Sequence, residues 1–196
     1  ADIDGDGDID LINSQGNGGN IVIWLNDGSE NFAVGTTIDP PGSGNRGAYV
    51  LHVADFTGDG RLDIFTINLN PSVGRVELFV RSSTGLSFTP QLSAEVFDLA
   101  GNLAGSDGPV DIDGDGDLDI IVANNIEGQV FTAPQVLVND GTGSVKRTDY
   151  PMADFPGHIL ASPGRNRDIA RGAMFGDYNR DGVIDFSYMT SNASNG

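Results

Sequence analysis

Cysteine is absent from this chain of 196 residues. Its absence excludes disulfide bonds, cysteine-ligated zinc sites and catalysis by a thiol. Long apolar runs are absent too, because no stretch reaches the roughly 18 apolar residues that a transmembrane helix requires. A small domain without disulfides needs another source of stability, and a bound metal ion is one such source.

Positive charge is scarce. The chain has 10 Lys and Arg against 28 Asp and Glu, which gives a formal net charge of −18. Binding to nucleic acid depends on Lys and Arg that neutralise phosphates. The composition therefore argues against a nucleic-acid partner and against attachment to an anionic membrane.

Helical periodicity is also missing. Short apolar runs alternate with turns rich in glycine, of which the chain has 28. This pattern is typical of an all-β protein.

The acidic residues are concentrated in four windows that share one frame, Asp-x-[Asp/Asn/Thr]-x-Asp-Gly-x-[Ile/Leu/Val]-Asp. Loop one is residues 2–10, loop two 55–63, loop three 111–119 and loop four 177–185. Their starts are 53, 56 and 66 residues apart. A period near this length indicates one blade of a β-propeller, or a similar β repeat.

The flanks of the loops repeat as well. Apolar runs predict a strand before the loop (48–54 and 170–176) and a strand after it (11–12, 64–67, 120–123 and 186–189). A third strand (21–25, 76–80 and 135–138) leads into a turn, which is Asn-Asp-Gly at 26–28 and at 139–141. A fourth strand follows near 31–34, 86–89 and 145–148. Each complete unit is predicted as a four-stranded antiparallel blade, with its Asp-rich loop between the first two strands.

These units divide the chain, as a single repeat region over residues 1–196, into about three to four blades. Repeat one (about 1–46) lacks its first strand, repeats two (about 47–104) and three (about 105–168) are complete, and repeat four (about 169–196) is incomplete. Two explanations remain open. Either the chain is a segment of a longer one, or another copy completes its open sheet edges.

The loops predict calcium sites, up to four in number. Calcium takes six to eight oxygen ligands from flexible loops. Side chains at positions 1, 3, 5 and 9 and the carbonyl at position 7 would supply them, with Gly at position 6 allowing the sharp turn. The candidate ligands are Asp2, Asp4, Asp6, Asp8 and Asp10; Asp55, Thr57, Asp59, Arg61 and Asp63; Asp111, Asp113, Asp115, Asp117 and Asp119; and Asp177, Asn179, Asp181, Val183 and Asp185.

Other interpretations of the loops are weaker. An EF-hand requires Glu at position 12 and flanking helices, and the chain has Asn13, Thr66, Val122 and Tyr188 there. Mg²⁺ demands strict octahedral geometry. Asp-Gly pairs can also form simple solvated turns, but four loops in one frame favour a shared ligand. Loops one and three carry more carboxylates than loops two and four, which predicts tighter binding there.

The loops and their flanks resemble the FG-GAP/VCBS repeats of integrin-α-like β-propellers. Residues 170–185 look most like the VCBS copies of ASPIC/UnbV-type proteins, and residues 22–28 and 137–141 match the hairpin strand of the family. The resemblance implies calcium-stabilised propeller blades, usually extracellular, that serve adhesion, glycan binding or scaffolding.

Outside the repeats, the segment 149–170 carries His158, Arg165 and Arg167, with Arg171 just beyond it. These cations are expected to compensate nearby acidic loops, and a weak alternative is that Arg165, Arg167 and Arg171 bind carboxylated sugars. His52 and Trp24 are predicted to pack within strands.

The leading hypothesis is a non-enzymatic, calcium-binding β-repeat module of a secreted or cell-surface protein, with a structural or adhesive role. Its partners would be calcium, glycans or surface proteins, and other copies or the rest of a longer chain. One alternative is a subunit that assembles into an extracellular fibre or ring by strand exchange. Another is the propeller portion of a secreted carbohydrate-active enzyme, such as a polysaccharide lyase.

Overall fold

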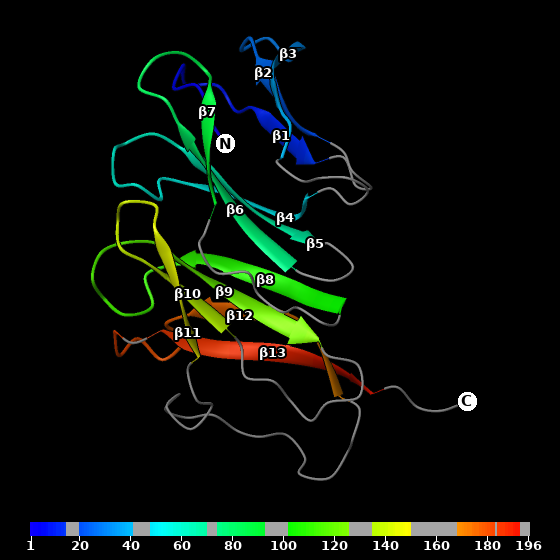
Figure 1. Ribbon diagram of the computed structural model, residues 1–196, viewed down its shortest axis with the longest axis vertical. Coiled ribbons are helices and arrows are strands. Elements are labelled where there is room, and N and C mark those ends of the chain that lie inside the picture. Colours follow the sequence, from blue (N-terminus) through cyan, green and yellow to red (C-terminus); the bar gives the residue numbers. More distant parts are fainter. Residues whose placement is uncertain are drawn as a thin grey trace. The chain divides into compact units, whose positions relative to one another are not determined.

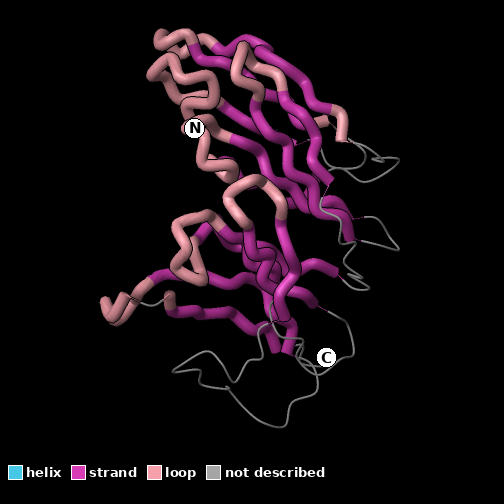
Figure 2. The backbone as a smooth tube through the Cα atoms, turned by 60° about the vertical axis from the view of Figure 1, so that its left-hand side comes forward, coloured by secondary structure: helices cyan, strands magenta, loops and turns pink. Residues whose placement is uncertain are grey.

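The structure, a computed structural model, describes residues 1–14, 20–40, 48–69, 74–92, 102–125, 135–149, 168–182 and 184–192. Every regular element in these ranges is a β-strand, which confirms the all-β prediction (Figure 2). Over the same ranges no helix of the length and apolarity needed to cross a membrane is found.

The strands form four antiparallel sheets in two compact units (Figure 1). Unit one is Ala1–Asp98 with Asp140–Ser144, and unit two is Leu99–Asn139 with Val145–Gly196. Sheets one and two belong to the first unit, and the strands of sheets three and four belong to the second.

Sheet one has the order β1-β2-β3, with β1 at Leu11–Ser14, β2 at Ile21–Asn26 and β3 at Phe32–Ile38. It has three strands, as predicted for repeat one. Ala1 and Asp10 pair through their backbones, with Asp10 N donating to Ala1 O at 2.8 Å, so loop one is closed even without a full strand before it.

Sheet two is a complete four-stranded meander, β4-β5-β6-β7. Its strands are β4 (Ala48–Ala54), β5 (Asp63–Leu69), β6 (Gly74–Arg81) and β7 (Phe88–Leu92). The last strand begins two residues later than predicted, because residues 82–87 are used by the connection between β6 and β7.

Sheet three repeats this meander with β8 (Asn102–Val110), β9 (Asp119–Asn125), β10 (Gln135–Asn139) and β11 (Val145–Asp149). Sheet four pairs β12 (Asp168–Gly176) with β13 (Asp185–Asn192). The strand expected before loop three in the complete third repeat is β8, although no apolar run marks it in the sequence. Its residues, NLAGSDGPV, are rich in strand-breaking types, and its register with β9 shifts twice.

The core of unit one lies between sheets one and two. Ile21 and Ile23 of sheet one pack with Ile64 and Phe79 of sheet two, and Ile3 of loop one is buried in the same cluster. These five side chains are 0–1% exposed, and the removal of their apolar surface from water stabilises the contact between the two sheets. Loop one is therefore anchored to the core by its own second residue.

Two aromatic predictions have different outcomes. His52 lies against Phe65 with ring centroids 6.4 Å apart, which fits its predicted packing within a strand. Trp24, also predicted to pack, keeps 37% of its surface exposed.

Candidate metal centres in the Asp-rich loops

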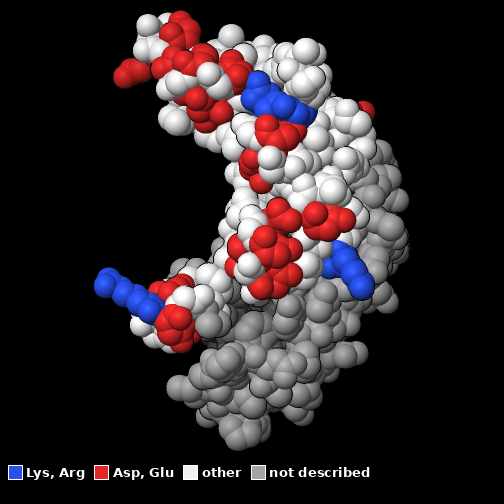
Figure 3. Space-filling view, turned by 90° about the vertical axis from the view of Figure 1, so that its left-hand side faces the viewer, with Lys and Arg blue, Asp and Glu red and all other residues white. Residues whose placement is uncertain are grey.

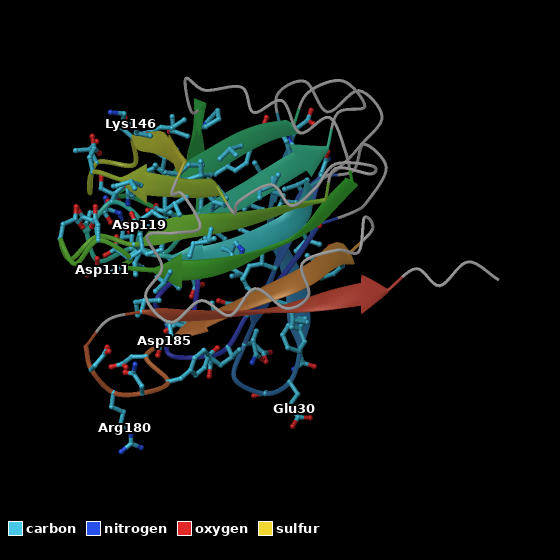
Figure 4. The ribbon with its side chains drawn as sticks, turned by 90° about the horizontal axis from the view of Figure 1, so that it is seen from below. Glu30, Asp111, Asp119, Lys146, Arg180 and Asp185 are labelled. Carbon is cyan, nitrogen blue, oxygen red and sulfur yellow. The ribbon has the colours of Figure 1, made fainter. Side chains whose placement is uncertain are left out.

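Each Asp-rich loop occupies the same place in its repeat. Loops two, three and four join the first and second strands of their sheets (β4 to β5, β8 to β9 and β12 to β13), and loop one leads into β1. Backbone pairing closes each loop between the residue before position 1 and the Asp at position 9, as between Ala54 and Asp63. Figure 4 shows Asp111 and Asp119 at the two ends of loop three. The predicted location of the loops is confirmed.

The carboxylate at position 1 organises each loop from inside. Asp2 accepts hydrogen bonds from Gly5 N at 2.8 Å and from Gly7 N at 3.0 Å, and Asp111 accepts the same pair from Gly114 and Gly116. Asp55 and Asp177 likewise accept from backbone N–H groups at positions 5 and 6. Each of the four loops thus curls around its own position-1 carboxylate in an Asx-type turn.

Glycine at position 6 is required by the backbone. Its φ is +99° in Gly7, +81° in Gly60, +98° in Gly116 and +86° in Gly182. Residues with a side chain rarely adopt these angles. The predicted role of this glycine in the sharp turn is confirmed.

The Asp at position 9 has a role that the sequence did not reveal. Asp10 is 2% exposed, and its two oxygens accept Ile3 N at 2.8 Å and Asn26 N at 2.9 Å. Asp119 accepts Ile112 N at 2.8 Å and Asn139 N at 2.9 Å in the same way. Each carboxylate therefore ties its loop to the end of the third strand.

Loop two contains the same tie. Asp63 accepts Phe56 N at 3.1 Å and Arg81 N at 2.9 Å, and it also accepts the hydroxyl of Thr57 at 3.2 Å. In loop four, Asp185 accepts Tyr178 N and Asn179 N. A position predicted only as a metal ligand is thus a structural brace in every loop.

The Asn of the hairpin turn supports the same region in two repeats. Asn26 Nδ2 donates to the carbonyl of Ile9 at 3.3 Å, and Asn139 Nδ2 donates to the carbonyl of Leu118 at 3.2 Å. Both carbonyls are at position 8 of their loops. The repeated Asn-Asp-Gly turn was the sequence signal for these contacts, but it was interpreted only as a turn.

Loops one and three gather carboxylates closely enough to share a cation. One oxygen each of Asp2, Asp4 and Asp10 lie within 4.8 Å of one another, and so do oxygens of Asp111, Asp113 and Asp115. Hard oxygen donors at this spacing fit a divalent cation such as Ca²⁺. The donor set therefore fits the predicted ion in these two loops, with Asp6, Asp8 and Asp117 in the same windows.

The pKa values of three carboxyl groups in the Asp-rich loops are raised. Burial raises the pKa of the Asp4 carboxyl, and the negative charges of Asp6, Asp10 and Asp2 raise it further. Burial also raises the pKa of Asp63 and of Asp119, although their backbone hydrogen bonds oppose the rise. A bound cation would relieve the repulsion around Asp4.

In loops two and four the carboxylate at position 5 instead accepts from a side chain of the same loop. In loop two the guanidinium of Arg61 forms a salt bridge with Asp59. In loop four the amide of Asn179 donates to Asp181 at 3.0 Å. Among the described residues, groups of three acidic ligand atoms within 4.8 Å occur in loops one and three and not in these two.

Acidic side chains on the surface are concentrated in patches. Figure 3 shows acidic side chains gathered in separate patches, with a few Lys or Arg side chains next to them. Val183, His158, Arg165 and Arg167 lie outside the described residues, and Arg171 lies in β12 with its side chain outside them. The predictions made for these positions remain predictions.

Comparison with known proteins identifies one family. The family model described as "FG-GAP-like repeat" matches residues 2–66 and 111–186, which together are more than half of the chain. These two matches include loops one to four. The search of curated proteins found no match.

Proposed function

Because the chain belongs to the FG-GAP-like repeat family, we propose that it is a calcium-binding β-repeat module with a structural and adhesive role in a secreted or cell-surface protein. One observation carries the proposal. Two loops of nearly identical sequence, in different repeats, each gather three carboxylate oxygens within 4.8 Å.

The chain's own residues would hold the ion in a defined way. Asp2, Asp4 and Asp10 would bind it in loop one, and Asp111, Asp113 and Asp115 would bind it in loop three. Calcium would supply positive charge and no redox or acid–base chemistry. Two ions would reduce the formal net charge of −18 by about four units and so lower the repulsion that opposes folding.

The loops are open to solvent, so a calcium ion can reach them without any rearrangement of the sheets. Asp113 and Asp115 are exposed, and Asp4 is partly so. Extracellular calcium modules typically bind with dissociation constants of about 10⁻⁴ to 10⁻³ M. At calcium 100 times the dissociation constant, one site would add about 2.7 kcal/mol to the free energy of unfolding.

The proposal is tested by calorimetric calcium titration of the chelator-treated protein, with melting followed in parallel. Matched variants are Asp4→Asn and Asp113→Asn, which change position 3 of loops one and three. Each is expected to remove one binding event and to leave the other loop unaffected. A melting temperature that is the same with and without calcium would contradict the proposal.

A second candidate function is self-association, and one feature of sheet one favours it. Leu11 pairs with Trp24, and Trp24 pairs with Val34, so the three form a row across one face of the sheet. Their exposures are 52%, 37% and 54%. Three adjacent apolar side chains exposed on one face of a sheet offer a contact surface.

Equivalent positions in the other sheets are buried. In sheet two the residues that correspond to Leu11 and Trp24 are Ile64 and Phe79, at 0% and 1% exposure, and they pack against sheet one. In sheet three they are Ile120 and Leu137, at 1% and 0%. These positions are therefore suited to contact another sheet of the same kind, and we assign that contact to a second copy of this chain.

Sedimentation of the calcium-loaded chain over a range of concentrations tests this assignment. Concentration-dependent dimers or larger species are expected, and Trp24→Lys should dissociate them. Thr89→Lys, which adds the same charge at an exposed position of β7, serves as the control. A strict monomer at the highest concentration would exclude self-association through this face.

A further inference from the structure

Loop two departs from loops one and three in the residue at position 7. Loops one and three have Asp8 and Asp117 there, whereas loop two has Arg61. The difference places a cation inside a loop that keeps Asp at positions 1, 5 and 9 (Asp55, Asp59 and Asp63) and has Thr57 at position 3, where loops one and three have Asp4 and Asp113.

The guanidinium of Arg61 is held at two points. Its Nη2 atom forms the salt bridge with Asp59, and its Nε donates to the backbone carbonyl of Arg81 at 3.4 Å. The side chains of Arg61 and Asp59 are 33% and 26% exposed, so both are partly shielded from water. Charge-assisted pairing of this kind is stronger than a neutral hydrogen bond.

The side chain of Arg81 does not compete for loop two. It extends to loop one, where its Nη2 donates to the carbonyl of Asp4 at 2.9 Å. Arg81 therefore offers its backbone carbonyl to Arg61 and its guanidinium to loop one. Arg61 is the cation that faces the acidic ligands of loop two.

The other polar side chains of loop two form hydrogen bonds within the loop. Asp55 accepts Asp59 N at 3.0 Å and Gly60 N at 2.7 Å. Thr57 donates its hydroxyl to Asp63 at 3.2 Å, a bond that the carboxylates at position 3 of loops one and three cannot form. A divalent ion that used Asp59 would have to displace the guanidinium and would lie close to its positive charge.

We propose that the guanidinium of Arg61 takes the place of a metal ion in loop two, so that this loop stays metal-free at calcium concentrations that fill loops one and three. The comparison with loops one and three rests on the proposed calcium binding. The closure of loop two by Arg61 rests on the geometry of that loop alone.

The experiment restores the residue that loops one and three have at this position. Arg61→Asp is expected to bind one more calcium ion than the unchanged chain in equilibrium dialysis. Arg61→Gln, a milder change that keeps an N–H donor, should gain the same site with lower affinity. The control is Lys146→Asp, because Lys146 is exposed, lies in β11 outside the four loops and carries the same charge (Figure 4). This control should bind the unchanged number of ions.

Asp59→Asn identifies the loop that responds. In the unchanged chain this substitution should leave the number of bound ions the same, and in the Arg61→Asp chain it should remove the added ion. The inference is overturned if Asp59→Asn removes an ion from the unchanged chain, or if neither Arg61 variant gains one.

A second measurement separates this inference from the proposed function. In chelator, Arg61→Asp should melt at a lower temperature than Lys146→Asp, because only the former loses a loop-closing cation. If the unchanged chain binds no calcium, the proposed function fails while this difference can still support the role of Arg61. Equal melting temperatures of the two variants in chelator would overturn it.

Discussion

Asp119 accepts the backbone N–H of Asn139 at 2.9 Å, across 20 residues of the chain. The same carboxylate accepts Ile112 N within its own loop. One buried side chain thus joins the start of loop three to the end of β10. Corresponding bonds in loops one and two, at 2.9 Å to Asn26 N and to Arg81 N, make this the recurring link of the repeat.

The first prediction concerns this link. Asp119→Asn has one acceptor oxygen where the carboxylate has two, so one buried backbone N–H group loses its partner. We expect a loss of about 1–3 kcal/mol in the free energy of unfolding, measured by denaturant melts in chelator. Asp115→Asn is the control, since Asp115 is exposed and should cost far less. Equal losses would show that Asp119 is only a ligand position.

The second prediction concerns glycine at position 6. Gly60 has a φ of +81°, and a Cβ added there would meet no atom within 4 Å. The cost of Gly60→Ala is therefore conformational and not steric, and we expect about 1–2 kcal/mol. Gly176→Ala is the control, because the nearest atom to its Cβ would be at an ordinary 3.5 Å. Thermal melts in chelator should show a loss for Gly60→Ala that clearly exceeds that of the control.

The third prediction compares two equivalent aromatic positions. Phe79 is 1% exposed, and Trp24 is 37% exposed. Phe79→Ala should remove about 3–5 kcal/mol from the free energy of unfolding, because it opens a cavity between sheets one and two. Trp24→Ala should cost much less in dilute solution, where association does not cover it. A comparable loss for Trp24→Ala at low concentration would mean that this face is already buried.

The fourth prediction concerns pH. The folded-state pKa values of Asp63 and Asp119 are raised above 3.8, chiefly by burial. The folded protein therefore takes up these protons at a higher pH than the unfolded chain. In chelator, their contribution to stability should rise as pH falls through the raised pKa values and should be complete below 3.8.

Calcium should reverse this dependence. Its carboxylate ligands must be deprotonated, and the pKa of Asp4 is raised by burial and by neighbouring carboxylates. The stabilisation by calcium should accordingly shrink as the solution is acidified toward that pKa. Melting temperatures measured from neutral to mildly acid pH, with calcium and with chelator, should converge. Curves that remain parallel would contradict this coupling.

The strands that were predicted well are those with apolar residues on both sides of an Asp-rich loop. The strand Ala48–Ala54 was predicted with its observed bounds, because its apolar run ends directly at loop two. Strand β8 follows from the completeness of repeat three but not from its own residues, since its sequence has Gly, Asp and Pro where the other first strands have apolar runs. Its pairing with β9 depends on the neighbouring strand, a tertiary effect that local sequence does not encode.

The residues of the candidate site could be predicted from the sequence. Which of them form structural hydrogen bonds, and which are left to bind a metal ion, could not. The spacing of Asp2, Asp4 and Asp6 indicates a loop whose oxygens converge. It does not show that Asp10 is turned toward Ile3 N and Asn26 N, because those donors come from backbone 7 and 16 residues away. Nor does it show that Arg61 folds back onto Asp59, since the direction of a long side chain is set by its surroundings.

The links made by Asp10, Asp63 and Asp119 all close within a single repeat, over spans of 7 to 20 residues. A whole repeat can consequently be inserted into or removed from such a chain without breaking any of these bonds. The Arg81–Asp4 contact is different, because it joins two repeats across 77 residues. Removing repeat one or repeat two would therefore break the Arg81–Asp4 contact, whereas the links within the remaining repeats would be kept.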